Sequence, residues 1–455
     1  MDRDAGERQW MPFLAGLVVG GAAMVLARAL TPRPALDTRL IKSTGEDPDV
    51  PTTVVVPGIL GSELLRPDGA QVWLNAGNAL GHHDLALPLS LPFAATDDGL
   101  VPGGLLGTDA VLPRLFGFTE YADLLDLLRA ADVRHHVFTY DWRRDLVESA
   151  RRLGAVLDAL AEARGEPAAR FNVVGHSMGG LVARYYLRFG GAEPVEGAPV
   201  TWAGARRIRS LVLVAAPNSG SVPSLDAILN GNRVGLSSTT LAASVIATMP
   251  AIYQLLPPAG SGAFLDHNAR PLDLDLHDVA TWDRHGWDPF SSTSPAARRG
   301  NAPETEVEPA ARRAFLAAAL TRAREVHLAL ARVPATPCPA RVVAVGGDCL
   351  PTLARAVVPH RRGAPPRFEP WTRQEAEAMF EAGDGRVTRA SVLASHLPGA
   401  ETSDVGSGLP EVASAFFGSA DHHGIYGEPT FQSVLLRLLL RPTRPATVLR
   451  AAGAA

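Results

Sequence analysis

The sequence contains almost no lysine and very little cysteine. Among 43 basic residues the one lysine is Lys42, and 47 acidic residues bring the formal net charge to −4. No run of basic residues offers the phosphate contacts that nucleic acid requires, so we expect no nucleic-acid partner. The two cysteines, Cys338 and Cys349, flank an apolar run typical of a strand. Extended chain between them would hold their Cα atoms much further apart than the ~6 Å that a disulfide spans, so we expect two buried free thiols.

The composition also lacks the signs of disorder. Hydrophobic residues make up 46% and charged residues 20% of the 455 positions, which is ordinary for a globular protein with a large core. This length predicts one large domain with insertions, or two domains.

Charged residues are absent from Gln9 to Ala27. A helix of that length, at ~1.5 Å per residue, nearly crosses the ~30 Å hydrocarbon core of a bilayer. Residues 1–30 are therefore expected to be a membrane anchor. A cleaved signal peptide stays open because Ala27-Arg28-Ala29 loosely fits a cleavage site, and so does a surface or buried helix. The protein is accordingly expected at a membrane, on a side that stays open, or secreted. Residues 31–50, rich in proline and charge, are predicted to be a linker.

The most informative stretch is Gly175-His176-Ser177-Met178-Gly179. An apolar β-branched run precedes it, and apolar residues at helical spacing follow from Met178, which predicts a strand, a sharp turn and a helix. A serine at the apex of such a turn exposes its hydroxyl, and the helix N-terminus favours an oxyanion beside it. Ser177 is therefore predicted to be a nucleophile. The alternative is a chance G-x-S-x-G in a glycine-rich chain.

Strands are predicted at residues 52–56, 133–140, 208–215 and 341–345 and in the run that reaches Gly175, with helices at 118–131, before 164 and at 430–440. This alternation predicts an α/β fold with a mostly parallel sheet and helices on both faces. We expect the core to comprise residues 51–221 and 336–455. A loop insertion is expected at 66–117, and a cap with a helix over 309–331 is expected at 222–335.

Two further motifs follow predicted strands. In Pro57-Gly58-Ile59-Leu60-Gly61 the glycines let the backbone present N–H groups, so Ile59 or Leu60 is expected to supply an oxyanion donor, unless the stretch is a simple turn. Asp141 and Arg143 are expected to lock a loop rather than to react. The run His82-His83-Asp84 has no further ligands at a usual metal spacing, so no metal is expected.

An acid and a base follow late in the chain. Asp384 lies in a glycine turn, and His422 precedes His423 on a short loop. The order Ser, Asp, His is the one expected of an α/β-hydrolase. On its own, Asp384 in such a turn is more typical of a structural role, and by position it is the best candidate acid.

These segments together resemble the lecithin:cholesterol acyltransferase family, which also contains phospholipid:diacylglycerol acyltransferases and lysosomal-type phospholipases. The resemblance rests on Pro57-Gly58-Ile59-Leu60-Gly61, Val72-Trp73-Leu74, Tyr140-Asp141-Trp142-Arg143, Gly175-His176-Ser177-Met178-Gly179, Ala216-Pro217 with Gly220-Ser221, Gly383-Asp384 with Val387, and His422 with Ile425. It implies an α/β-hydrolase fold with Ser177 as nucleophile, Asp384 as acid, His422 as base, and an oxyanion hole formed by the N–H groups of Ile59 and Met178. His423 departs from the family's single histidine and leaves open which imidazole acts.

The resemblance implies a serine acyl hydrolase or acyltransferase acting on lipid esters, of the O-acyltransferase or phospholipase A type. The expected partners are a lipid ester and a membrane surface, with no metal or organic cofactor. A soluble carboxylesterase for smaller esters is one alternative, and a membrane-anchored binding protein without catalysis is another. Hydrolysis or transfer, the acyl donor and acceptor, and the oligomeric state stay open.

Overall fold

A parallel six-stranded sheet forms the centre of the computed structural model, which describes residues 50–73, 85–93, 97–106, 120–233, 240–290, 308–361 and 363–440. Its strands, in spatial order, are β15 (Val412–Gly418), β11 (Arg341–Gly347), β7 (Ile208–Val214), β6 (Phe171–His176), β1 (Thr53–Val56) and β5 (His135–Val137). Every neighbouring pair is parallel. The predicted α/β class with a mostly parallel sheet is confirmed.

The order of the strands reverses between β1 and β6. From β1 the chain moves outward to β5 and then returns to the opposite side of β1 as β6. Such a reversal opens a crevice at the carboxyl ends of the strands, where α/β proteins bind their ligands. All residues of β1 and β6 are buried, as expected for apolar strands covered on both faces.

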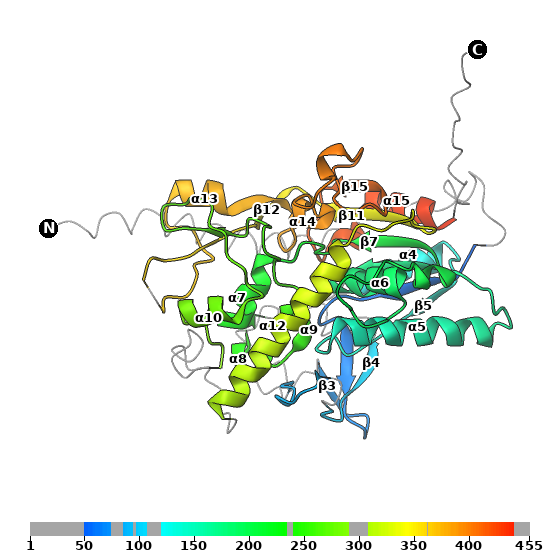
Figure 1. The fold of residues 1–455 in the computed structure, drawn as a ribbon. Coiled ribbons are helices and arrows are strands. Elements are labelled where there is room, and N and C mark those ends of the chain that lie inside the picture. The colour runs from blue at the N-terminus through cyan, green and yellow to red at the C-terminus, as the bar shows by residue number, and fades with distance from the viewer. Residues whose placement is uncertain are drawn as a thin grey trace, which may run out of the picture. The chain divides into compact units, whose positions relative to one another are not determined.

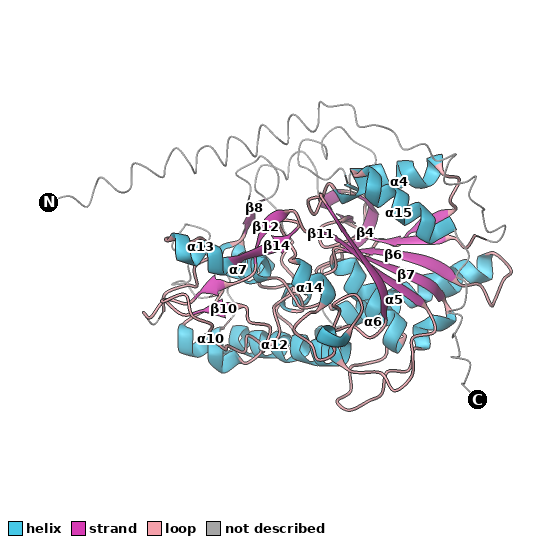
Figure 2. Cartoon of the chain, turned by 90° about the horizontal axis from the view of Figure 1, so that it is seen from above, coloured by secondary structure: helices cyan, strands magenta, loops and turns pink. Residues whose placement is uncertain are grey.

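Helices cover both faces of the sheet (Figure 2). The helices α4 (Glu120–Ala130) and α15 (Pro429–Leu440) lie on one face, and α5 (Leu146–Ala163) and α6 (Met178–Phe189) lie on the other. The Asp145 side chain caps α5 by accepting the N–H of Val147 at 2.6 Å. Every residue of α6 is buried, because α5 and the sheet enclose it.

A buried charge cluster fixes α6 to later parts of the chain. Glu411, just before β15, pairs with Arg184 at 2.7 Å and with Arg188 at 2.9 Å, and all three side chains are at most 1% exposed. The same guanidinium groups donate to the carbonyl oxygens of Leu330 and Arg332 at the end of α12 (Pro309–Ala331). Burial opposes ionisation of Glu411, but the two guanidinium groups outweigh it and lower the pKa of this carboxyl.

Residues 222–335 contain mostly helices, and α12 runs diagonally across the ribbon in Figure 1. Its bounds agree with the predicted helix. In the described parts of this segment, the other helices are α7 (Val222–Asn230), α8 (Ala243–Ile246), α9 (Pro250–Tyr253) and α10 (Val279–His285). The division of the chain into core and cap stays a prediction.

The predicted loop insertion at residues 66–117 is not loop throughout. It contains β3 (Gln71–Trp73) and β4 (Val101–Leu105), which pair with β2 (Ser62–Leu65) in an antiparallel sheet. These strands are three to five residues long, too short for an alternation of apolar and polar residues to reveal them.

The remaining elements of the described residues are β8 (Asn232–Arg233), β9 (Thr240–Leu241), β10 (Phe264–Leu265), β12 (Leu350–Leu353), β13 (Ala356–Val357), α13 (Arg373–Met379), β14 (Phe380–Gly383), α14 (Arg389–Leu393) and short 3-10 turns.

The thiols of Cys338 and Cys349 are free, as predicted, but their predicted burial is wrong. Cys338 is half-buried and Cys349 is exposed. Strand β11 continues to Gly347, and Cys349 lies at the corner that leads into β12. At this corner the Cys349 side chain faces solvent.

Within the ranges that the structure describes, no helix has both the length and the apolar character needed to cross a membrane. The predicted N-terminal segment, the linker up to residue 49 and His82-His83-Asp84 lie outside those ranges.

Candidate active site

Ser177 lies at the turn between β6 and α6, with a φ of 51° and a ψ of −126°. A residue with a side chain adopts this backbone conformation only at a cost, so surrounding contacts must hold it. One such contact is the hydrogen bond from the Ser177 N–H to the carbonyl oxygen of Val214, at 2.8 Å. The strand, turn and helix expected around Ser177 are all present, whereas its role as nucleophile stays a prediction.

Two glycines let the loop after β1 lie directly against this turn. A Cβ atom on Gly179 would come within 2.3 Å of the Pro57 carbonyl oxygen. A Cβ atom on Gly58 would come within 2.9 Å of the Ser177 Cβ. Neither position therefore has room for a side chain, and the loop at residues 57–61 is held beside the serine.

Asp384 and His422 form a hydrogen-bonded pair. Asp384 Oδ2 lies 2.8 Å from His422 Nδ1, and the His422 N–H donates to the Asp384 carbonyl oxygen at 2.9 Å. The other carboxylate oxygen accepts the N–H groups of Arg386 and Val387 at 2.9 and 2.7 Å. Burial raises the pKa of Asp384, but His422 and the turn N–H groups outweigh it and lower the pKa. An ionised Asp384 only accepts, so Nδ1 carries the proton in the neutral form of His422 and Nε2 of that form is an acceptor.

Ser177, His422 and His423 line the same pocket. Among the hydrogen bonds of the described residues none joins Ser177 Oγ to His422; such bonds often tighten only when substrate binds. The backbone N–H of His423 donates to Asp421 at 3.2 Å, whereas the Asp384 carboxylate engages His422. The bond to Asp384 is the geometric reason to propose His422 rather than His423 as the base.

The loop at residues 57–61 has most of its backbone groups engaged. The Pro57 carbonyl accepts the Tyr140 hydroxyl, the Gly58 N–H donates to Tyr121, and the Leu60 carbonyl accepts the Trp73 indole N–H, all at 2.8 to 2.9 Å. No hydrogen bond within the described residues uses the N–H of Ile59 or of Met178. These N–H groups remain available to an oxyanion, and the loop that carries Ile59 is fixed before any ligand binds.

The pocket beside Ser177 has a volume of about 270 Å³ and is lined mainly by apolar side chains. Its polar lining residues include Ser177, His422, His423 and Arg386. Its apolar walls come from α7, α8, α9 and the segments around them, and comprise Pro223, Ala227, Leu241, Ile246, Met249, Ile252 and Leu255. In the part of the chain that the structure describes, no three His, Cys, Asp or Glu side chains lie close enough to hold a metal ion.

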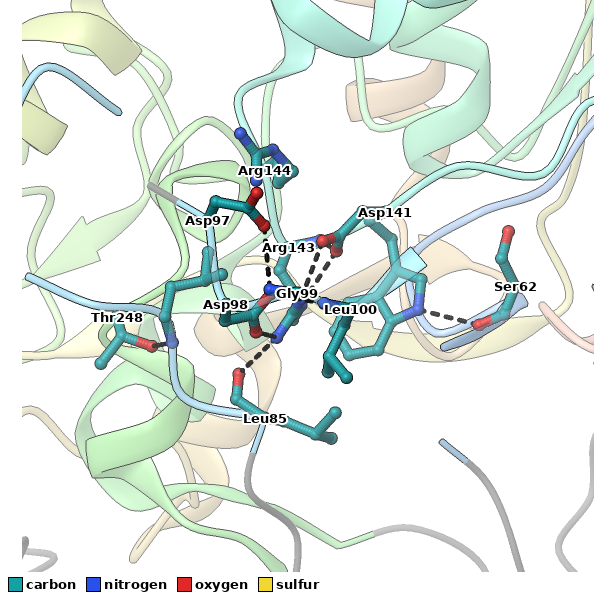
Figure 3. Close-up of polar contacts among 12 residues, drawn as sticks. Ser62, Leu85, Asp97, Asp98, Gly99, Leu100, Asp141, Arg143, Arg144 and Thr248 are labelled. Atoms are coloured by element: carbon teal, nitrogen blue, oxygen red, sulfur yellow. Dashed lines mark hydrogen bonds and ion pairs between the residues drawn. The ribbon is translucent and has the colours of Figure 1, made fainter. Parts of the chain in front are cut away.

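Asp141 and Arg143 form a buried ionic cluster outside the pocket (Figure 3). Arg143 Nε and Nη2 donate to the two Asp141 carboxylate oxygens at 2.9 and 2.8 Å, and Nη1 lies 2.5 Å from Asp98. Burial opposes ionisation of Arg143, but the two carboxylates outweigh it and raise the pKa of the guanidinium. Nη1 also donates to the Leu85 carbonyl. The cluster therefore ties the segment after β5 to Leu85 and Asp98, which agrees with the structural role expected of Asp141.

Residues 117–284 match the family model described as lecithin:cholesterol acyltransferase. The resemblance to this family is confirmed over that stretch. It contains Ser177, Asp141 and Arg143, whereas Ile59, Asp98, Asp384 and His422 lie outside it. No protein of curated function matches the sequence.

Solved structures resemble the chain in fold. A chain of the Tle4–Tli4 complex is 15% identical to this chain, with a TM-score of 0.52. The alignment covers 86% of this chain and 98% of that one. The mature lipase BlEst2 of Bacillus licheniformis is 11% identical to this chain, with a TM-score of 0.38. The alignment covers 87% of this chain and 95% of the lipase. Together with the strand order of the sheet, the first likeness confirms the predicted α/β-hydrolase fold.

Sequence reasoning from the lecithin:cholesterol acyltransferase family missed two buried residues that contact the predicted site. Tyr121, at the start of α4, bonds both Gly58 and His176, and the other ring nitrogen of His176 bonds the His422 carbonyl oxygen. A tyrosine far from the serine in sequence gives no motif. Only the position of His176 beside Ser177 was a signal.

Proposed function

We propose that the protein is a serine acyl hydrolase or acyltransferase that acts on lipid esters through an acyl-enzyme. The observation that carries the proposal is the hydrogen bond between Asp384 and His422 in the wall of the pocket that also contains Ser177. The match to the lecithin:cholesterol acyltransferase model supports ester acyl chemistry. The apolar walls of the pocket support a fatty acyl chain as the bound group.

In the proposed reaction, Ser177 Oγ attacks the ester carbonyl carbon while His422 Nε2 takes the hydroxyl proton. The bond to the leaving alcohol then breaks, and His422 returns the proton to that alcohol. Water or an acceptor alcohol attacks the acyl-serine in the same way, which releases a fatty acid or a new ester. Asp384 holds the His422 tautomer and stabilises the imidazolium that forms in each step.

The oxyanion of each tetrahedral intermediate is assigned to the N–H groups of Ile59 and Met178. Neither N–H group has a hydrogen-bond partner among the described residues. Met178 is the first residue of α6, and the helix dipole favours negative charge beside its N–H group. Each donor is worth about 3 kcal/mol in the transition state.

Ser177→Ala tests the proposal most directly. An alkyl fluorophosphonate should label wild-type Ser177 and should not label the variant, while the two proteins melt at the same temperature. A wild-type protein that stays unlabelled would support the catalytically inactive binding protein instead.

Product analysis separates hydrolysis from transfer. A phospholipid with one labelled acyl chain is supplied with and without diacylglycerol, and products are identified by mass spectrometry. Labelled fatty acid in both samples identifies a phospholipase, and labelled ester that depends on the acceptor identifies an acyltransferase. Turnover confined to short-chain esters would favour the soluble carboxylesterase.

We also propose that residues 1–30 hold the protein at a membrane, because residues 9–27 contain no charge. Flotation with vesicles should recover the full chain and lose it when these residues are deleted. A processed N-terminus after residue 29 would identify a signal peptide instead.

A further inference from the structure

A continuous chain of hydrogen bonds joins the loop at residues 57–61, which carries Ile59, to the loop that carries His422. The Gly58 N–H lies 2.8 Å from the Tyr121 hydroxyl, that hydroxyl lies 2.8 Å from His176 Nδ1, and His176 Nε2 lies 3.2 Å from the His422 carbonyl oxygen. Tyr121 and His176 are 1% and 2% exposed. Both side chains also line the pocket, so the chain runs along its wall and connects three segments that are distant in sequence.

The partners determine the direction of every bond in this chain. A carbonyl oxygen can only accept, so His176 Nε2 carries a proton and donates a hydrogen bond to the His422 carbonyl oxygen. The pKa of His176 lies well below its ordinary value, because the ring is buried and lies near His422 and His423, so the imidazole is neutral. A neutral ring with a proton on Nε2 accepts at Nδ1, and the Tyr121 hydroxyl donates to it. The Tyr121 oxygen then accepts the Gly58 N–H.

Each end of the chain fixes a group that the reaction needs. The Gly58 N–H is adjacent to the peptide that carries the Ile59 N–H, so the bond to Tyr121 sets the direction of that donor. The His422 backbone is held on its N–H side by Asp384 and on its carbonyl side by His176. The His176 and His422 rings also lie against each other, with centroids 4.9 Å apart.

We propose that Tyr121 and His176 are positioning residues, which align the Ile59 N–H and the His422 imidazole with Ser177. This inference rests on the proposed function and adds two residues to it. Both residues line the pocket, but their hydrogen bonds described above go to the backbone of Gly58 and of His422, so both act through the loops that they hold. Transition-state stabilisation depends on donors that are fixed in advance, so a loop released from Tyr121 loses part of the stabilisation without losing substrate binding.

Tyr121→Phe removes the hydroxyl and keeps the ring. The matched control is Tyr185→Phe, which removes a hydroxyl that donates to the Ala192 carbonyl at 2.8 Å from a ring that is 0% exposed, at a position that does not line the pocket. The probe is an alkyl fluorophosphonate, because its reaction requires the serine, the base and the oxyanion hole whatever the natural substrate is. The measured quantities are the maximal labelling rate, the probe concentration at half that rate, and the melting temperature.

We expect Tyr121→Phe to lower the maximal labelling rate about tenfold or more while the half-saturating concentration stays within about twofold, since orientation rather than binding is lost. Tyr185→Phe should leave both quantities unchanged. His176→Gln places an amide N–H near the Nε2 position, so it should retain several times the rate of His176→Ala.

A maximal rate for Tyr121→Phe within twofold of wild type would overturn the inference and leave the proposed function intact. Equal rates for His176→Gln and His176→Ala would also overturn it. If the wild-type protein itself is not labelled at Ser177, the proposed function and this inference fall together.

Discussion

The substitution Asp141→Ala should destabilise the protein much more than it slows catalysis. Arg143 is 0% exposed, and the substitution removes the two hydrogen bonds that its guanidinium makes to Asp141 while Asp98 and the Leu85 carbonyl remain. Breaking a buried ion pair costs about 3–5 kcal/mol, and the remaining Asp98 places this case at about 3 kcal/mol. For roughly 400 residues that unfold with ~2 cal/mol/K each, that loss lowers the melting temperature by about 4 °C.

The assay combines a thermal melt with turnover per site titrated by fluorophosphonate. Asp126→Ala is the matched control, because Asp126 also pairs with an arginine but its side chain is 75% exposed. An exposed pair is worth at most about 1 kcal/mol, so the control should melt close to wild type. Turnover per titrated site should remain within about threefold in both variants, since neither carboxylate lines the pocket. An Asp141→Ala protein that melts like wild type and has no turnover would refute the structural assignment of Asp141.

Three further predictions concern the turn at Ser177, the buried charge cluster around Glu411 and the pocket beside Ser177. Gly179→Ala places a Cβ atom 2.3 Å from the Pro57 carbonyl oxygen and should abolish labelling of Ser177; labelling at the wild-type rate would contradict the close approach. Glu411→Gln should lower the free energy of unfolding by about 3 kcal/mol or more at pH 7. Because the folded pKa of Glu411 lies below its ordinary 4.5, its stabilisation is complete above about 4.5 and is lost as the pH falls through the lower folded value. The difference between wild type and variant, measured by urea unfolding, should therefore shrink in acid, and a difference that grows in acid would contradict the pKa assignment. Met249→Trp fills part of the apolar wall and should reduce turnover of long-chain esters much more than that of short-chain esters, and an unchanged ratio would exclude Met249 from the acyl site.

The local features of the fold were predictable because they depend on neighbours in sequence. The helix α12 begins at Pro309, and proline favours the first turn of a helix. The turn at Ser177 was predictable because a β-branched run, two glycines and a helical pattern stand next to one another. Hydrophobic periodicity and turn-forming residues determine local structure over a few residues, so both can be recognised from neighbouring positions in the sequence.

Strand β15 (Val412–Gly418) was missed because most of its side chains are exposed or half-buried, at the edge of the sheet. An edge strand needs no continuous apolar run, so its sequence has no strong signal. The pairing of Asp384 with His422 was expected from chain order and from the family resemblance, and the reason to prefer His422 over His423 came from the folded geometry. The Tyr121 and His176 contacts depend on packing between distant segments, which no local pattern encodes.

The bond between His176 and the His422 carbonyl has a consequence for the order in which the protein matures. It joins positions 246 residues apart, and a contact across so long a stretch carries a large entropic cost of loop closure and forms after local structure. Synthesis delivers Ser177 long before it delivers Asp384 and His422. If the proposed roles hold, a growing chain therefore carries its nucleophile without its base until the segment after β15 has been added, and a chain cut short before residue 422 is expected to lack esterase activity.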